Sequence, residues 1–157
     1  MRLQTRIANP SSKEGIKLLT DSYALMSTLF PPEDNHALSI EDFKAPNIYF
    51  IIAYKDDKPC GCGALATKSN YGELKSIFVD EKCRRIGIGE LIMMELEVKA
   101  KNLKLNELYL ETGANLLAAI KLYRKLGFIE CSPFGDYKES PHSFFMFKKI
   151  HSSLIKF

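Results

Sequence analysis

Residues 73–91 read ELKSIFVDEKCRRIGIGEL. Glu73–Val79 is predicted to be a strand, Arg84–Gly89 a glycine-containing loop, and the apolar spacing that starts at Ile88 an amphipathic helix running to about Leu103. A strand that runs through such a loop into a helix presents free backbone N–H groups at the positive end of the helix dipole. The stretch therefore predicts a binding site for an anion such as phosphate.

Two common phosphate-binding motifs do not fit this loop. A P-loop has Lys-Ser/Thr directly after its last glycine, whereas here Gly89 is followed by Glu90-Leu91. A Rossmann fingerprint needs a third glycine at the position of Ile92. The glycines of the loop let a phosphate approach the backbone closely. Arg84 and Arg85 add charge-assisted donors, so the anion site is predicted without either fingerprint.

Outward from this stretch, residues 1–157 are predicted to form one mixed α/β domain without repeats or long linkers. The early strands are expected to be antiparallel, and the unit from Glu73 to Glu111 a parallel strand–helix–strand crossover. Apolar residues at helical spacing (Ile16, Leu19, Tyr23 and Met26) mark the first helix. That helix is predicted to open with the capping box Ser11–Glu14 and to end at Pro31-Pro32. The other predicted elements are a short helix with the box Ser39–Asp42, strands Asn47–Tyr54 and Pro59–Thr67 joined by a hairpin turn at 55–58, strand Glu107–Glu111, helix Ala114–Leu126, and strands Phe128–Cys131 and Ser143–Lys149.

A second motif lies at the end of the helix over Ala114–Leu126, where the chain reads Leu122-Tyr123-Arg124-Lys125-Leu126-Gly127-Phe128. Together with Arg84-x-x-Gly87-x-Gly89, it resembles the GNAT acetyltransferase superfamily, which carries Arg/Gln-x-x-Gly-x-Gly/Ala after its central strand and Leu-Tyr-x-x-x-Gly-Phe on a later helix. The resemblance covers Pro59–Phe128 by motif and the whole chain by element order. It implies an α/β (α+β) fold with a mostly antiparallel sheet, and a small bacterial acyltransferase that moves an acetyl group from acetyl-CoA to a primary amine by direct attack.

The resemblance also implies roles for individual residues. Tyr123 would protonate the departing CoA thiolate as a general acid, and Glu73 best matches the family's general base, a role that a water chain or the free amine could also fill. A backbone N–H of the central strand would stabilise the oxyanion. The acetyl-CoA contacts would come from the backbone of Ile77, Phe78 and Val79 for the pantetheine arm, from the amides of Arg84, Arg85, Ile86, Gly87, Ile88 and Gly89 for the pyrophosphate, and from Asn115.

Several positions depart from the family pattern. Glu81, Arg85 and Ile86 stand where the family often has Pro, Gly and a basic residue, and Leu116 stands where it often has Asn, with Asn115 one place away. These departures bear on cofactor affinity rather than on the fold.

The acceptor is expected to be a small-molecule amine or a peptide. The first helices and the segment Ser132–Pro141 should form its side of the site. Acidic residues near the first two helices would favour a cation there, although acidic helix starts are also ordinary capping; they are Glu33, Asp34, Glu41 and Asp42. A non-catalytic acyl-CoA sensor or regulatory module is the alternative function, and Tyr123 argues against it.

Composition limits the other classes of function. The chain has 157 residues, 46% of them hydrophobic, and a net charge of +3 without a concentrated basic stripe, so neither a nucleic-acid nor a membrane partner is expected. The N-terminus lacks the apolar segment of a signal peptide, which predicts a cytoplasmic protein. Four reduced cysteines follow from that location, and the scattered histidines predict no metal site. An exposed edge on the strand Ser143–Lys149 suggests a homodimer.

Overall fold

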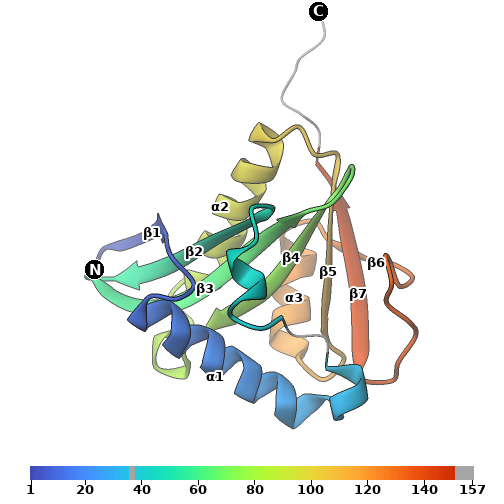
Figure 1. The fold of residues 1–157 in the computed structure, drawn as a ribbon, viewed down its shortest axis with the longest axis horizontal. Coiled ribbons are helices and arrows are strands. Elements are labelled where there is room, and N and C mark those ends of the chain that lie inside the picture. The colour runs from blue at the N-terminus through green and yellow to red at the C-terminus, as the bar shows by residue number, and fades with distance from the viewer. Residues whose placement is uncertain (36–37, 151–157) are drawn as a thin grey trace, which may run out of the picture.

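The computed structural model describes residues 1–35 and 38–150, which form a sheet with helices on both faces (Figure 1). Over the described residues the sheet has seven strands in the order β1-β2-β3-β4-β5-β7-β6. Neighbouring strands are antiparallel except β4 and β5, which are parallel. The predicted fold class is thereby confirmed. The strands are β1 (Leu3–Ile7), β2 (Ile48–Lys55), β3 (Lys58–Thr67), β4 (Gly72–Val79), β5 (Glu107–Gly113), β6 (Ile129–Glu130) and β7 (Ser143–Lys149).

The helices lie in two layers, one on each face of the sheet (Figure 1). One layer holds α1 (Lys13–Leu29) and the 3-10 turn η2 (Asp42–Lys44), and the other holds α2 (Ile88–Asn102) and α3 (Leu117–Lys125). The 3-10 turns η1 (Pro32–Asp34) and η3 (Glu81–Cys83) follow α1 and β4. In β2, Phe50 and Ile52 pack in the core on the α1 side, whereas Ile51 and Ala53 pack in the core on the α2 side. Because both of its faces are covered, this strand is a nearly continuous apolar run.

Local chemistry explains where several elements begin and turn. Ser12 caps α1, with its Oγ accepting a hydrogen bond from the N–H of Gly15 at 3.0 Å. The hairpin between β2 and β3 turns through Asp56 and Asp57, whose φ angles are +49° and +69°. Two successive positive φ values define a type I′ turn, which matches the twist of the strands it joins. The predicted hairpin turn at 55–58 is confirmed. The predicted capping box Ser11–Glu14 is wrong, because the N-cap is Ser12, one residue later, and the position three residues on is Gly15, which has no side chain to complete a box.

Of the four apolar residues whose spacing marked the first helix, Leu19 is the one that the structure buries. Leu18 and Leu19 are buried together with Gly15 and Ser22. Ile16 and Tyr23, by contrast, are 43% and 53% exposed. The packing of α1 against β3 and β4 determines which of its residues are buried. The spacing of the large apolar residues was not enough to identify them.

Two element boundaries also differ from expectation. β1 was not predicted, because LQTRI is short and lacks an apolar face; it exists through its antiparallel pairing with β2. The predicted helix start at Ala114 is wrong, and α3 begins at Leu117. The N–H of Ala114 still donates to the carbonyl of His142 at 2.9 Å, so this residue extends the sheet rather than the helix.

The expectation of four reduced cysteines is wrong for two of them. Cys60 on β3 and Cys83 in η3 are joined by a disulfide between Cα atoms 5.8 Å apart. Cys62 is a buried free thiol, and Cys131 is a half-buried one. The two cysteines meet because pairing of β3 with β4 brings the turn after β4 back to the start of β3.

Strands β4 and β5 separate along their length. Their parallel pairing is confined to Gly72–Leu74 on β4 and Leu108–Leu110 on β5. On the other side of β4, the register with β3 shifts between Cys62 and Ala64, and Ser76 has a φ of +53°. This is a β-bulge, in which the bulged strand bends and leaves a residue out of the ladder. The later part of β4 therefore has its backbone open on the β5 side.

Candidate active site

The loop after β4 has the geometry of an anion site. Gly87 is the N-cap of α2 with φ +92°, and Arg85 before it has φ +67°. A Cβ built on Gly87 would meet no atom within 4 Å, so the backbone there faces open space. The first hydrogen bond of α2 runs from the N–H of Leu91 to the carbonyl of Gly87, which leaves the preceding N–H groups of the first turn without partners in the helix. These amides and the helix dipole together attract an anion.

A cavity of about 1240 Å³ connects this loop with β4 and with both helical layers. Its walls come from α1 and the segment after it, from β4, from the start of α2, and from the end of β5 with α3. Among the residues predicted to bind the cofactor, all line it except Ile86, which packs against the core instead. Those lining it are Ile77, Phe78, Val79, Arg84, Arg85, Gly87, Ile88, Gly89 and Asn115.

The loop is fixed to the strand before it and to the helix beside it. Nε of Arg84 donates to the carbonyl oxygen of Val79 at 3.2 Å, which folds the loop back on β4. A Cβ on Gly89 would lie 3.0 Å from Cδ2 of Leu122, so the glycine lets α2 approach α3 closely. The sequence motif thus combines an open backbone with tight helix packing.

Tyr123 lies on α3, is 5% exposed and lines the cavity. Burial raises the pKa of its phenol above the ordinary value, because the charged phenolate is poorly solvated there. Its ring is 6.2 Å from that of Phe128, centroid to centroid. The side chain is thus held protonated at the cavity wall.

Glu73, at the start of β4, also lines the cavity and is only 4% exposed. Its Oε2 accepts a hydrogen bond from the Tyr137 hydroxyl and another from Nζ of Lys75 at 3.1 Å. Burial, followed by the nearby charge of Glu73 and this hydrogen bond, raises the pKa of Tyr137. A buried carboxylate needs such partners, because an unpaired charge out of water is costly.

Sequence reasoning missed Lys75 and Tyr137 as members of this site. Lys75 follows Glu73 by two residues on a strand, so the period of two places both side chains on one face, and this signal was available. Tyr137 lies in the segment expected on the acceptor side, but its contact with Glu73 joins positions 64 apart in sequence. Local pattern gave no sign of that pairing.

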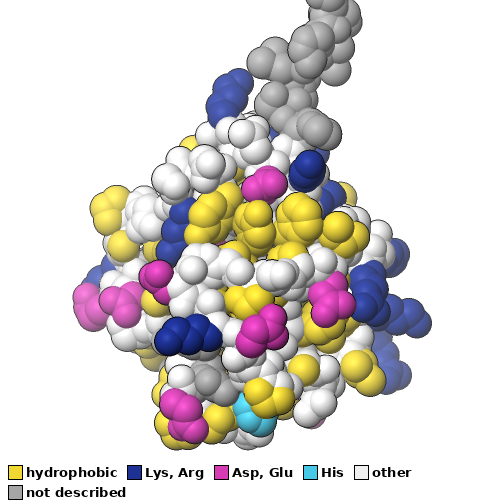
Figure 2. Space-filling view, turned by 90° about the vertical axis from the view of Figure 1, so that its right-hand side faces the viewer, with side chains coloured by type: hydrophobic (Ala, Val, Ile, Leu, Met, Phe, Trp, Pro, Cys, Tyr) yellow, Lys and Arg dark blue, Asp and Glu magenta, His cyan; other side chains and the backbone are white. Residues whose placement is uncertain are grey.

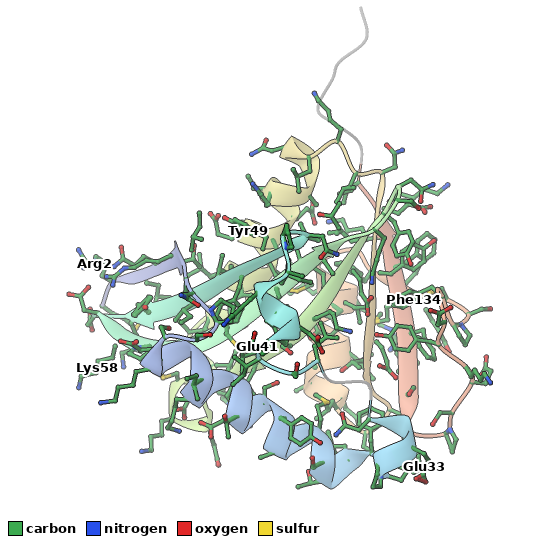
Figure 3. All side chains as sticks on the ribbon, viewed as in Figure 1. Arg2, Glu33, Glu41, Tyr49, Lys58 and Phe134 are labelled. Carbon is green, nitrogen blue, oxygen red and sulfur yellow. A yellow bond between two sulfur atoms is a disulfide. The ribbon has the colours of Figure 1, made fainter. Side chains whose placement is uncertain are left out.

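The acidic side chains expected on the acceptor side do not line the cavity where the structure describes them. Glu33, Glu41 and Asp42 are exposed and lie away from its walls, with Glu33 labelled beyond the end of α1 in Figure 3. The fourth, the side chain of Asp34, lies outside the described part of the structure. Within the described residues, the wall from α1 and 38–43 is mainly apolar, with Leu19, Met26, Phe30, Leu38 and Phe43 among its members. The carboxylates lining the cavity are instead Glu73, Glu90 and Glu111.

Two other expectations concern absences. In the described parts of the chain, no helix is long and apolar enough to cross a membrane. Over those same residues no group of three metal-ligating side chains comes together. Of the histidines, His142 packs edge-on against Phe30, while His36 and His151 lie outside the described residues.

Known proteins share both the sequence and the fold. The sequence model of the acetyltransferase (GNAT) family matches residues 18–128. An IAA acetyltransferase from Azospirillum brasilense is 35% identical over 144 residues, which are 90% of this chain and 94% of that protein. The uncharacterised N-acetyltransferase YsnE of Bacillus subtilis is 34% identical over 151 residues, or 94% and 100% of the two chains.

A solved structure supports the fold. The PaiA N-acetyltransferase from Thermoplasma acidophilum, in complex with coenzyme A, has a TM-score of 0.73 at 19% identity over 96% of this chain and 100% of that one. At that identity the likeness shows the fold alone. The family match spans most of the chain and includes the loop and helix that line the cavity. The chain therefore belongs to the GNAT family of N-acetyltransferases.

Proposed function

We propose that the protein transfers an acetyl group from acetyl-CoA to a primary amine by direct attack. One observation carries the proposal: a single cavity is lined by the open strand β4, the loop whose amides precede the first hydrogen bond of α2, the buried Tyr123 and the buried Glu73. The amides after Arg84 suit the pyrophosphate, and the backbone of β4 beyond the bulge suits the extended pantetheine arm.

The reaction uses these groups in sequence. The ammonium of the acceptor gives a proton to Glu73, directly or through one water. The amine nitrogen then attacks the thioester carbonyl carbon and forms the C–N bond, while a backbone N–H of β4 stabilises the charge on the oxygen. The C–S bond breaks, and Tyr123 gives its proton to the departing thiolate. The second proton of the acceptor nitrogen then leaves through water and restores the Tyr123 phenol, so that the products are the amide and the CoA thiol.

Acetyl-CoA binding is the first test. Ligand at about 100 times its dissociation constant adds roughly 2.7 kcal/mol to the unfolding free energy. For a domain of this size we expect the melting temperature to rise by about 5–10 °C with acetyl-CoA but not with ATP or NAD. No rise at saturating acetyl-CoA would remove the basis of the proposal.

The cavity also favours one class of acceptor, a primary amine or peptide N-terminus with an apolar body. The wall from α1 is mainly apolar, and the charged side chains that line the cavity from β4 and β5 are Glu73, Lys75 and Glu111, which sum to one negative charge. We expect such a site to take one cationic amine beside these carboxylates and an apolar group against the wall from α1. A polyamine would leave further charges against Leu19, Met26 and Phe30, at a desolvation cost.

A matched set of amines checks this class. Burying an apolar group of phenyl size is worth about 1.5–3 kcal/mol, so we expect kcat/KM for 2-phenylethylamine to exceed that for ethanolamine by roughly 10- to 100-fold. The rate is followed by release of the CoA thiol. A preference for spermidine or ethanolamine would contradict the proposed class, and acetyl-CoA binding with no turnover of any amine would favour a non-catalytic acyl-CoA sensor.

Three expectations from the sequence stay predictions. The single domain over 1–157 and the cytoplasmic location are two of them. The third is the homodimer, which was expected because β7 would expose an edge. That support is weakened, because β6 pairs with β7 at Phe147 and Met146 and β7 is not the outermost strand.

A further inference from the structure

We infer that Lys75 and Tyr137 are positioning residues that hold the carboxylate of Glu73 in its reactive orientation. The inference rests on the proposed role of Glu73 as general base. Neither side chain belongs to the two sequence motifs of the loop and the later helix. Both line the same cavity as Glu73, and both bond to the same oxygen of its carboxylate.

The three side chains form a closed ring of hydrogen bonds. Nζ of Lys75 donates to Oε2 of Glu73 at 3.1 Å and to the Tyr137 hydroxyl oxygen at 2.9 Å. The Tyr137 hydroxyl in turn donates to Oε2 of Glu73. In this pattern the Tyr137 hydroxyl is a donor, and the raised pKa of Tyr137, caused first by burial, keeps that phenol protonated.

The two carboxylate oxygens of Glu73 differ in their hydrogen bonds. Oε2 is fixed by two donors, whereas Oε1 has Nζ of Lys68 at 3.9 Å, beyond hydrogen-bond length. Lys68 is 41% exposed, so this pair is screened by solvent. Oε1 is therefore the oxygen that can take a proton from the acceptor or from an intervening water.

Aromatic packing holds the segment that carries Tyr137 against the sheet. Phe134 is 9% exposed, and its ring centroid is 4.9 Å from that of Tyr109 on β5 and 4.9 Å from that of Tyr137. Figure 3 labels Phe134 beside β7, and Figure 2 shows apolar side chains gathered on this side of the molecule. Tyr137 is thus held on a fixed support, as a positioning residue needs to be.

Lys75 is supported by the strand itself. It shares a face with Glu73 on β4, two residues along, and its side chain is 11% exposed. The ammonium also lies 5.7 Å from the centroid of the Tyr137 ring. Together the two donors restrict rotation of the carboxylate, so less freedom has to be lost when it meets the acceptor.

A double-mutant cycle tests the inference through kcat. The effects of substitutions are not additive when two residues act through one group. We therefore expect Tyr137→Phe to lower kcat about 5- to 50-fold in the native chain but less than about twofold in a Glu73→Gln background. Rates are measured with acetyl-CoA and 2-phenylethylamine and, without amine, for hydrolysis of acetyl-CoA by water in the same site. The KM for acetyl-CoA should not change.

Control variants separate positioning from support of the fold. Tyr109→Phe removes a hydroxyl that donates to Glu107 at 3.1 Å outside the cavity, and it should leave kcat unchanged. Lys75→Met should behave as Tyr137→Phe does, and Lys75→Arg should restore part of the loss. The inference would be overturned if Tyr137→Phe lowered kcat equally with and without Glu73, or if it lowered the rate of neither reaction. If acetyl-CoA did not raise the melting temperature of the native chain, the proposed function itself would be rejected instead.

Discussion

Replacing Glu73 with Gln is expected to lower kcat by about 10²–10⁴-fold, the usual contribution of a general base. The amide keeps the shape of the side chain but cannot take up the proton of the acceptor. The KM for acetyl-CoA should stay unchanged, because Glu73 lies at the start of β4, away from the loop after Arg84. Steady-state rates at saturating concentrations of both substrates, with CoA release as the readout, measure the effect.

Glu107→Gln is the matched control for this variant. Glu107 is also a carboxylate on the sheet that accepts a hydrogen bond from a tyrosine hydroxyl, at 3.1 Å, but it does not line the cavity. Its replacement should leave kcat within about twofold, since surface substitutions away from special features change little. If Glu73→Gln also kept its kcat, a water chain or the free amine itself would have to supply the proton transfer, and the base assignment would be wrong.

Replacing Tyr123 with Phe is expected to lower kcat by about 10²–10⁴-fold as well, because the departing thiolate loses its proton donor. The ring still packs against Phe128, so the melting temperature should change little. A general acid has to be protonated to act, and burial raises the pKa of Tyr123 from its ordinary 10.0. Activity of the native chain should therefore not decline as the pH rises toward 10.

Tyr49→Phe is the control for the tyrosine prediction. Tyr49 on β2, labelled in Figure 3, also has a pKa raised by burial, and it lies outside the cavity. Its loss should leave kcat unchanged. A Tyr123→Phe variant with native kcat would show that the thiolate leaves without help from α3.

The fold could be predicted largely because its determinants are local. The serine cap at the start of α1, the Asp56-Asp57 turn and the apolar periods each act within a few residues, so they can be recognised without tertiary context. The predictions were wrong where the packing of helices or the pairing of strands determines the structure. β1 exists only through β2, and Ala114 stays in the sheet because the carbonyl of His142 accepts its N–H. The disulfide likewise needs β3 and β4 to pair first.

On the cofactor side of the candidate site, too, the local features could be predicted from the sequence and the packing could not. Gly87, Gly89 and the arginines before them lie on one continuous stretch, so strand, loop and helix follow from the order of residues. That Ile86 turns into the core, while its neighbours Arg85 and Gly87 line the cavity, depends on how α2 packs.

The acceptor side was decided by tertiary contacts. The sequence was enough to single out Glu73 and Tyr123, because a family pattern fixes their place relative to the glycine loop. It could not reveal that Tyr137 reaches Glu73, because a hydrogen bond across 64 positions depends on the path of the whole sheet and on the packing of Phe134. Nor could it show that α1 presents an apolar wall to the cavity while its acidic neighbours face solvent, since the rotation of a helix about its axis is set by what it packs against.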